Sequence, residues 1–353
     1  MVSRYFILSG IPMTQITICN EIQNMISYLV ENLKPSTSKT IQSLTNGVEN
    51  LNFPDLSIFE FITKKQGRRG PSKTRCIEYY SQKLVSCQLF DLNSYFIISR
   101  NAWITNSLFF DVLKEGFQTL TIPKSGTYSF EVIGAGNDNE RSGARIIGKI
   151  RLERGEKITV ALGQQGKGGW ISASGATFVV KETGNGPEPL FVAAGAGYSD
   201  DNNYGRASLA QTANGNEKIG SSGVQKFPNG EEEDFYCSGA GFLETPKVGR
   251  LNDKSEPPQS YSQGLMGGKG YSYDGNHELE GGFGGGGAKF DRKLNGKLKF
   301  YEGCGGGYTG GSSRIRNDQN CDGGGGGSYA ADSNATFGHK FEKFGKCKIE
   351  FLN

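Results

Sequence analysis

The sequence predicts a mainly β protein with a β-sandwich fold, on three observations. Short segments rich in β-branched and aromatic residues recur from about residue 76 onward, with turn residues between them. This spacing is typical of a sandwich and not of an α/β sheet. Glycine occupies 23 of the 64 residues from Gly264 to Gly327, which indicates an insertion of unusual backbone. Helical periodicity is confined to the first part of the chain, so we expect a small helical segment there.

The N-terminal part of the chain carries this helical pattern. Ile22, Met25, Ile26 and Leu29 follow helical spacing and predict an amphipathic helix over residues 19–33. A second helical piece is expected over residues 39–52. The type of the short apolar segment 56–62 is not decided by its pattern.

A basic segment follows, because residues 64–75 hold six basic side chains and no acid. A solvated linker is the simplest interpretation of such a run, and a nuclear-import or processing site is the alternative. We therefore expect three regions: a helical segment over 1–63, a basic linker over 64–75 and a β-sandwich over 76–353.

The strands of the sandwich are expected in a regular succession separated by turns. Pro123-Lys-Ser-Gly126 and Arg154-Gly-Glu156 have the composition of tight turns. Tyr128, Phe130 and Val132 alternate with smaller or polar residues, as in a half-buried antiparallel strand. The expected strands cover 83–90, 94–99, 102–110, the region 117–133 around its turn, 145–152, 157–162, 176–180, 190–194 and 346–352.

The overall composition argues against several kinds of partner. Thirty-nine basic and 36 acidic residues leave a net charge of +3, too balanced to predict binding to nucleic acid or to an anionic membrane. No apolar run approaches the roughly 20 residues of a membrane-spanning helix. Residues 1–19 lack the continuous apolar stretch of a secretory signal, so the sequence predicts a soluble chain or one whose true start is missing.

No recognisable catalytic motif occurs in the sequence. Gly134-Ala-Gly136 and Gly195-Ala-Gly197 each follow an expected strand, but neither leads into the amphipathic helix of a dinucleotide site. Tight turns at strand ends explain these glycines more simply. The two histidines, His277 and His339, lie in no metal-binding or nucleophilic motif. We expect no enzyme activity, no cofactor and no metal site.

Seven cysteines show neither a CxxC motif nor metal-ligand spacing. On local grounds, Cys76 with Cys87 and Cys304 with Cys321 are the two candidate disulfides. The alternative is that all the cysteines are reduced, buried thiols. Asn334-Ala-Thr336 is a glycosylation sequon if the chain enters the secretory path.

The glycine blocks are expected to be packed and not to be a flexible linker. They contain Phe283, Tyr308 and Tyr329, whereas flexible linkers carry serine and avoid aromatic residues. Glycine lets backbones approach closely, so extended polyproline-II-like helices can lie side by side and pair their N–H and C=O groups. We expect this array over about residues 264–329. Its structural glycines are Gly281, Gly282, Gly284, Gly285, Gly286, Gly287, Gly305, Gly306, Gly307, Gly323, Gly324, Gly325, Gly326 and Gly327.

Seven pieces of the sequence follow one another in a distinctive order. They cover 122–136, 155–166, 174–180 and 189–197, and then the three glycine blocks 280–288, 305–311 and 323–329. In order and spacing these pieces resemble the glycine-rich domain of the anaplastic lymphoma kinase and leukocyte tyrosine kinase receptors. The resemblance spans about residues 117–352 and is more specific than glycine content alone.

The resemblance implies a tumour-necrosis-factor-like jelly-roll that carries an inserted array of polyglycine helices. It also implies an extracellular module that binds polypeptides, since the domain in those receptors binds small secreted ones. The sequence holds no kinase region and no transmembrane helix, so the binding module carries over and receptor signalling does not. The motifs assign no ligand-contact residues.

We therefore expect a non-enzymatic protein-binding module whose partner is a polypeptide ligand or a second copy of the chain. The alternative function is a structural or adhesive secreted protein that self-associates. The resemblance implies an extracellular location; a truncated start or an intracellular location is the alternative, because no clear signal peptide is seen.

Overall fold

The computed structural model describes residues 58–62, 65–76 and 110–352. Within the last range, gaps fall at 138–139, 169–171, 224, 227–231, 234–236, 247–254, 273–276, 295–296 and 317–319. The described residues are mainly β, with strands in several sheets and the short helix α5 (Asn202–Gly205). The helices expected over 19–33 and 39–52 and the strands expected over 83–90 and 94–99 lie outside these residues, as does nearly all of 102–110.

One face of the sandwich is a five-stranded antiparallel sheet in the order β1-β19-β4-β5-β18. The strands predicted over 145–152 and 346–352 are confirmed as β5 and β19. Buried and half-buried residues alternate along β4, as its aromatic and polar side chains predict. The bounds are β1 (Ile58–Ile62), β4 (Gly126–Ile133), β5 (Gly143–Leu152), β18 (Thr336–Lys340) and β19 (Lys346–Phe351).

The opposite face is a six-stranded antiparallel sheet in the order β17-β8-β7-β6-β3-β2. The strands predicted over 157–162, 176–180 and 190–194 are confirmed as β6, β7 and β8. The bounds are β2 (Phe110–Lys114), β3 (Phe117–Thr121), β6 (Lys157–Ala161), β7 (Thr177–Thr183), β8 (Gly186–Ala193) and β17 (Tyr329–Ala330).

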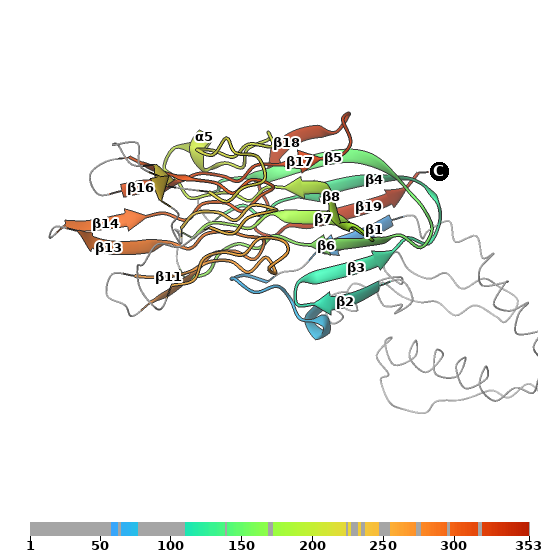
Figure 1. The fold of residues 1–353 in the computed structure, drawn as a ribbon, viewed down its shortest axis with the longest axis horizontal. Coiled ribbons are helices and arrows are strands. Elements are labelled where there is room, and N and C mark those ends of the chain that lie inside the picture. The colour runs from blue at the N-terminus through green and yellow to red at the C-terminus, as the bar shows by residue number, and fades with distance from the viewer. Residues whose placement is uncertain are drawn as a thin grey trace, which may run out of the picture.

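The two sheets enclose the main hydrophobic core (Figure 1). Phe130 of β4 and Phe191 of β8 meet across it with their ring centroids 5.0 Å apart. The turn that contains Gly126 joins β3 to β4, and the turn that contains Gly155 joins β5 to β6, so both turns carry the chain from one sheet to the other. Buried aromatic side chains from both sheets thus fill the space between them, as in a β-sandwich.

The basic segment is solvated only in part, because Arg69, Lys73 and Arg75 are exposed and Arg68 is buried. The strand β1 before it pairs with β19, so the sandwich already includes residues from the expected N-terminal region. Within the segment, Arg68 is buried: its Nε donates to the carbonyl of Gly267 at 3.2 Å, and its guanidinium forms an ion pair with Glu256. The composition of the segment could not reveal that Arg68 is buried, because its partners Gly267 and Glu256 lie 199 and 188 residues further along the chain. The predicted boundary at 64–75 is therefore corrected.

Beyond the ends of the sandwich strands lie the glycine-rich segments and two further sheets (Figure 1). The six-stranded mixed sheet has the order β10-β9-β15-β16-β14-β13, and β11 pairs with β12. The bounds are β9 (Gln225–Lys226), β10 (Glu232–Glu233), β11 (Lys269–Tyr271), β12 (Glu278–Glu280), β13 (Phe290–Leu294), β14 (Lys297–Tyr301), β15 (Ser313–Ile315) and β16 (Asn320–Gly323).

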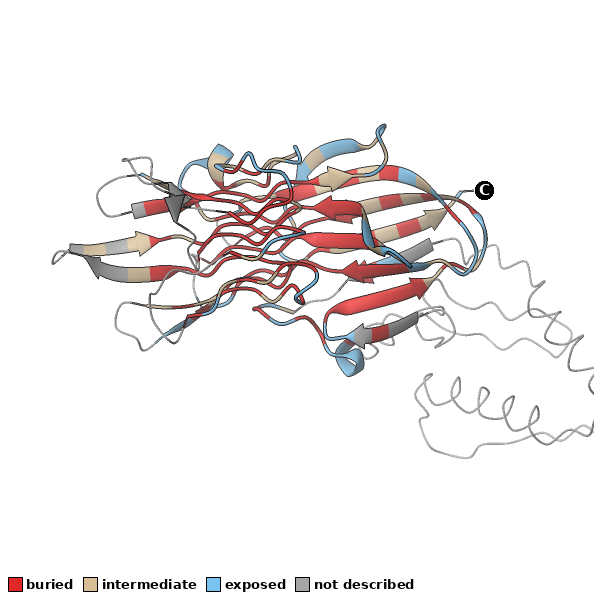
Figure 2. Cartoon of the chain, viewed as in Figure 1, coloured by how far each residue is buried: buried red, intermediate tan, exposed pale blue. Residues whose placement is uncertain are grey.

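The glycine-rich segments pack against one another through their backbones. We call this set the glycine array; its members are residues 134–136, 174–176, 195–197, 239–241, 281–287, 303–311 and 323–327. Backbone hydrogen bonds join them, for example from Gly195 N–H to Gly306 C=O at 2.9 Å and from Ala240 N–H to Gly285 C=O at 2.9 Å. Figure 2 shows these segments coloured as buried along most of their length. Their polar backbone groups are thus satisfied by neighbouring segments and not by water.

The fourteen glycines expected to build the array are all buried. A Cβ atom on any of them except Gly285 would lie less than 3.0 Å from another atom, usually a backbone atom of a neighbouring segment. Gly285 instead has a φ of +80°, where side chains are unfavourable. The array is wider than the sequence predicted: Gly134, Gly136, Gly195 and Gly197, interpreted as glycines of tight turns, lie inside it under the same close contacts.

Candidate binding surface

The outward face of the six-stranded sandwich sheet is covered by aromatic residues from the glycine-rich region. Phe178 and Val180 of β7 point away from the main core and contact a second hydrophobic cluster. Phe242, Tyr261 and Phe283 supply the other side of that cluster. The aromatic residues embedded among the glycines thus attach the array to the sheet.

The rings of this second cluster form a continuous row. Phe117 contacts Tyr261 with ring centroids 5.4 Å apart, and Tyr261 stacks on Phe242 at 5.1 Å. Phe242 stacks on Tyr308 at 5.9 Å, and Tyr308 stacks on Tyr329 at 4.5 Å. The first three residues are buried, whereas Tyr308 and Tyr329 are half-buried, so the row runs from the interior to the surface.

Two exposed apolar side chains lie beside this row, on segments joined to Phe242 and Tyr308 through the backbone. Leu243 is 64% exposed and Ile219 is 53% exposed, the two largest values among the large hydrophobic side chains of the described residues. The backbone N–H of Leu243 donates to Gly220 C=O at 3.2 Å, and that of Phe242 donates to Tyr308 C=O at 2.8 Å. We call Ile219, Leu243, Tyr308 and Tyr329 the apolar patch. Large exposed apolar side chains held together in this way are typical of interaction sites.

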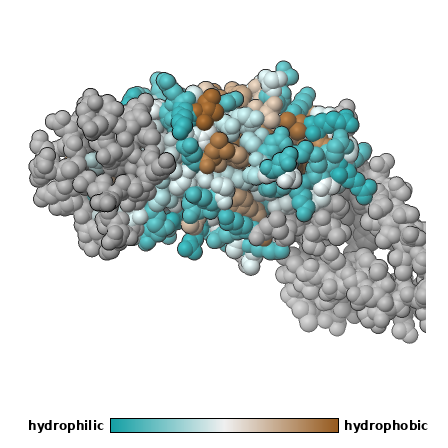
Figure 3. Space-filling view, in the orientation of Figure 1, coloured by the Kyte–Doolittle hydropathy of each residue, from teal (hydrophilic) through white to brown (hydrophobic). Residues whose placement is uncertain are grey.

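The patch has polar surroundings and a fixed backbone. Lys218 and Glu244, each next in sequence to a patch residue, form an ion pair at 3.5 Å. The Oγ1 of Thr309 accepts a hydrogen bond from Gly220 N–H at 2.8 Å and holds the loop beside Ile219. On the face drawn in Figure 3, small separate groups of hydrophobic side chains lie among hydrophilic ones. An apolar centre with a polar rim is the usual anatomy of a protein-binding surface.

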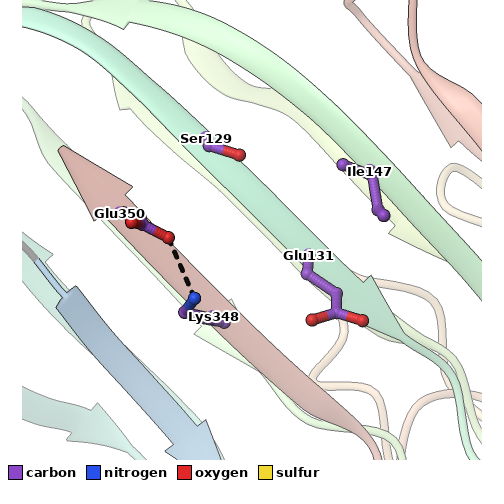
Figure 4. A pocket seen from close by; sticks show the side chains of 5 residues that line it. All are labelled: Ser129, Glu131, Ile147, Lys348 and Glu350. Carbon is purple, nitrogen blue, oxygen red and sulfur yellow. Dashed lines mark hydrogen bonds and ion pairs between the residues drawn. The ribbon is translucent and has the colours of Figure 1, made fainter. Parts of the chain in front are cut away.

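A shallow hollow on the outer face of the five-stranded sheet is the second candidate (Figure 4). It has a volume of about 190 Å³, smaller than the roughly 300–1,000 Å³ of most small-molecule pockets. Lys348 pairs with Glu350 at 2.9 Å, and Glu131 pairs with Arg145 at 2.6 Å. Its charged groups therefore already neutralise one another. Its lining is Ser129, Glu131, Ile147, Lys348 and Glu350.

The cysteines and the sequon occupy different places from the patch. Cys76 is a buried free thiol, and Cys87 lies outside the described residues. Cys304 and Cys321 are also buried free thiols, so the expected disulfide between them is not formed in this structure, and their pairing stays a prediction. Asn334 is exposed just before β18, where its sequon is open to solvent.

The sequence analysis missed the patch because no local signal marks it. Ile219 and Leu243 stand in polar, turn-rich sequence that predicts a solvated loop. Only Tyr308 and Tyr329 were singled out, as aromatic residues among glycines. Neither histidine belongs to the patch: Nε2 of His339 lies 2.9 Å from the carbonyl oxygen of Ala207, and His277 stands just before β12.

Fold and surface together define a mainly β, sandwich-like protein with a backbone-packed glycine array and an exposed apolar patch. No protein-family model matches the chain, and a search of curated proteins finds no match. Among the residues that the structure describes, no helix is long and apolar enough to cross a membrane.

Proposed function

We propose that this chain is a non-enzymatic protein-binding module of the type found in the glycine-rich domain of the anaplastic lymphoma kinase and leukocyte tyrosine kinase receptors. Its fold is then a tumour-necrosis-factor-like jelly-roll with inserted polyglycine helices. The support is the order of the seven sequence pieces, together with the packing of all seven in the sandwich and the glycine array.

The directions of the backbone hydrogen bonds in the array favour polyglycine helices and argue against an additional β-sheet. Gly195 donates its N–H to Gly306 at 2.9 Å, while its own C=O accepts from Gly326 at 3.1 Å, a residue of a different segment. The N–H of Gly305 likewise goes to Gly324, and its C=O accepts from Gly311. Groups that point to different neighbours fit an extended helix with three residues per turn.

The exposed apolar patch is the observation that carries the binding function. Leu243 projects into solvent from a backbone fixed by hydrogen bonds on both sides. Binding to this surface loses little conformational entropy, because hydrogen bonds to neighbouring segments already order its backbone. A polypeptide with an apolar anchor side chain and flanking polar groups is the partner that fits this chemistry.

A display screen tests the function directly. The immobilised chain is used to select from a library of secreted polypeptides, and each selected polypeptide is measured against wild type, Leu243→Asp and the control Phe341→Asp. Phe341 is 42% exposed and lies outside the patch. We expect affinity to fall at least tenfold for Leu243→Asp alone. Equal affinity for all three proteins, or no selected polypeptide, would contradict the proposal.

The second candidate function is self-association, which the same patch favours because Ile219 and Leu243 can be buried against a second copy. Light scattering after size-exclusion chromatography separates the two functions. A wild-type oligomer that dissociates with Leu243→Asp supports self-association, and a monomer at high micromolar concentration argues against it.

We further propose an extracellular location, as the resemblance implies. The exposed sequon at Asn334 supports it, since glycosylation needs an accessible acceptor.

A further inference from the structure

Three cysteines meet beside the glycine array in a small buried cluster. Cys237 and Cys321 share this cluster with Phe290 and Tyr301, and Cys304 is joined to Cys237 through its backbone. Cys237 and Cys304 have no exposed surface, and Cys321 is 4% exposed. The cluster is separate from the apolar patch, and neither the fold nor the proposed function assigns these thiols a role.

Cys237 and Cys304 are direct neighbours in both backbone and side chain. The N–H of Cys304 donates to the carbonyl of Cys237 at 2.7 Å. Hydrogen-bonded neighbouring backbones lie about 4.8 Å apart, within the Cα separation of about 4.4–6.8 Å that a disulfide requires. Burial raises the pKa of the Cys304 thiol well above its usual value, and a hydrogen bond with the Cys237 thiol raises that pKa further. The two buried thiols therefore lie close to one another, on backbones that are hydrogen-bonded together.

Cys321 has a different backbone environment. It pairs with Tyr301 and Ile315 in the mixed sheet, and its carbonyl accepts from the N–H of Glu302 at 3.1 Å. The Cys321 thiol also raises the pKa of Cys304, but less than the Cys237 thiol does. The cysteine that is hydrogen-bonded to the backbone of Cys304 is thus Cys237, although Cys321 is nearer in sequence.

We propose that Cys237 and Cys304 form an intramolecular disulfide when the chain folds in an oxidising environment. This bond would tie the array segment 239–241 to the segment 303–311. The structure holds the reduced form, with both residues as free thiols. Because both sulfurs are buried, the exchange takes place before the array closes over them.

The oxidant is a small-molecule disulfide such as oxidised glutathione. The thiolate of one cysteine attacks it, which forms a mixed disulfide and releases one glutathione thiolate. The second cysteine then attacks the mixed disulfide, so the protein S–S bond forms and a second glutathione leaves. Two protein thiols are oxidised, one glutathione disulfide is reduced to two thiols, and the two protons pass to the released thiolates.

Peptide mapping of the full-length chain tests the pairing. The reduced, denatured protein is refolded in a buffer of reduced and oxidised glutathione, remaining thiols are alkylated, and cross-linked peptides are identified by mass spectrometry without reduction. We expect a peptide that joins Cys237 to Cys304 in wild type and in Cys321→Ser. Adding a reductant should lower the melting temperature of both by about 5–10 °C.

Variants keep the test decisive. Cys237→Ser should lose the cross-link and show no melting shift with reductant. If Cys237→Ser fails to fold, the cross-linked peptides found in wild type and in Cys321→Ser still show which cysteines are paired. A Cys304–Cys321 peptide in wild type, or alkylation of both Cys237 and Cys304 in refolded protein, overturns the proposal. Ligand binding is measured separately, so failure here leaves the proposed function intact.

Discussion

Gly195 and Gly306 lie backbone to backbone, and the N–H of Gly195 donates to the C=O of Gly306 at 2.9 Å. Gly195 follows β8 of the sandwich, whereas Gly306 belongs to a block of glycines far along the chain. This contact shows that the array packs directly onto the sandwich and is not a separate unit. Side chains would prevent it, since a Cβ on Gly195 would collide with the backbone of Ser174 and Gly175.

The array should therefore be intolerant of single methyl groups. A Cβ on Gly325 would lie within 3.0 Å of the backbone of Arg206 and Ala207, atoms that cannot move without shifting a segment. We expect Gly325→Ala to lower the free energy of unfolding by about 3 kcal/mol, measured by urea denaturation.

Gly184→Ala is the matched control, because a Cβ there meets no atom within 4 Å and no unusual φ is required. We expect this variant to be neutral or slightly stabilising. Equal stability of the two alanine variants would show that the array is not closely packed.

The sequence predicted β3 to β8 and β19 because their signals are local, whereas it did not predict β1, β2, β17 and β18. Alternating residues around Phe130 mark β4, and turn residues such as Gly155 mark the strand ends. It also predicted that the glycine blocks are packed, since aromatic residues such as Phe283 and Tyr308 stand among them. These signals do not say which segments become neighbours.

The parts that sequence did not predict depend on distant partners. Gly195-Ala-Gly197 looks like an ordinary turn, and only its contacts with Gly306 and Gly326 place it in the array. The basic run around Arg68 looks solvated until Glu256 and the Gly267 carbonyl are brought beside it. For Cys304, the nearest cysteine in sequence is Cys321, but its backbone N–H donates to Cys237.

Two adjacent residues should separate stability from binding. Phe242 is 6% exposed and stacks on Tyr261, whereas Leu243 beside it is 64% exposed. We expect Phe242→Ala to cost about 3–4 kcal/mol of unfolding free energy, and Leu243→Asp to change it by less than about 0.5 kcal/mol. Thermal and urea denaturation measure both. A large loss for Leu243→Asp would show that Leu243 belongs to the core.

Asn334 offers a test of the proposed location. It begins the only N-x-S/T sequon of the chain and is exposed. When the chain is directed into the secretory path of eukaryotic cells, we expect one glycosidase-sensitive mass shift. Asn334→Gln should remove the shift and Thr336→Ser should keep it, because serine preserves the sequon. A secreted wild-type chain without any glycan would contradict this expectation.

Glu302 should make the stability depend on pH. Burial raises the pKa of its carboxyl from the ordinary 4.5 to about 8; the ammonium of Lys289 opposes this rise, and the carboxylates of Asp291 and Asp322 add to it. Its Oε2 is buried without a hydrogen-bond partner within the described part of the chain. Glu302 is therefore protonated in the folded protein at neutral pH and ionised in the unfolded chain.

The sign of the effect follows from proton binding. Between about pH 4.5 and pH 8 the folded state holds a proton that the unfolded state releases, so stability from Glu302 is complete below pH 4.5 and is lost as pH rises to 8. Its slope is at most about 1.4 kcal/mol per pH unit. Glu302→Gln removes this pH-dependent contribution to stability, so the stability of the variant relative to wild type should increase from pH 5 to pH 8.

Urea denaturation at each pH measures that difference. The control is Glu188→Gln, a substitution of an exposed residue, whose stability should change with pH in parallel with wild type. If Glu302→Gln also stays parallel, the Glu302 carboxyl is solvated and ionised in the folded protein, and the cluster beside Lys289 is open to water.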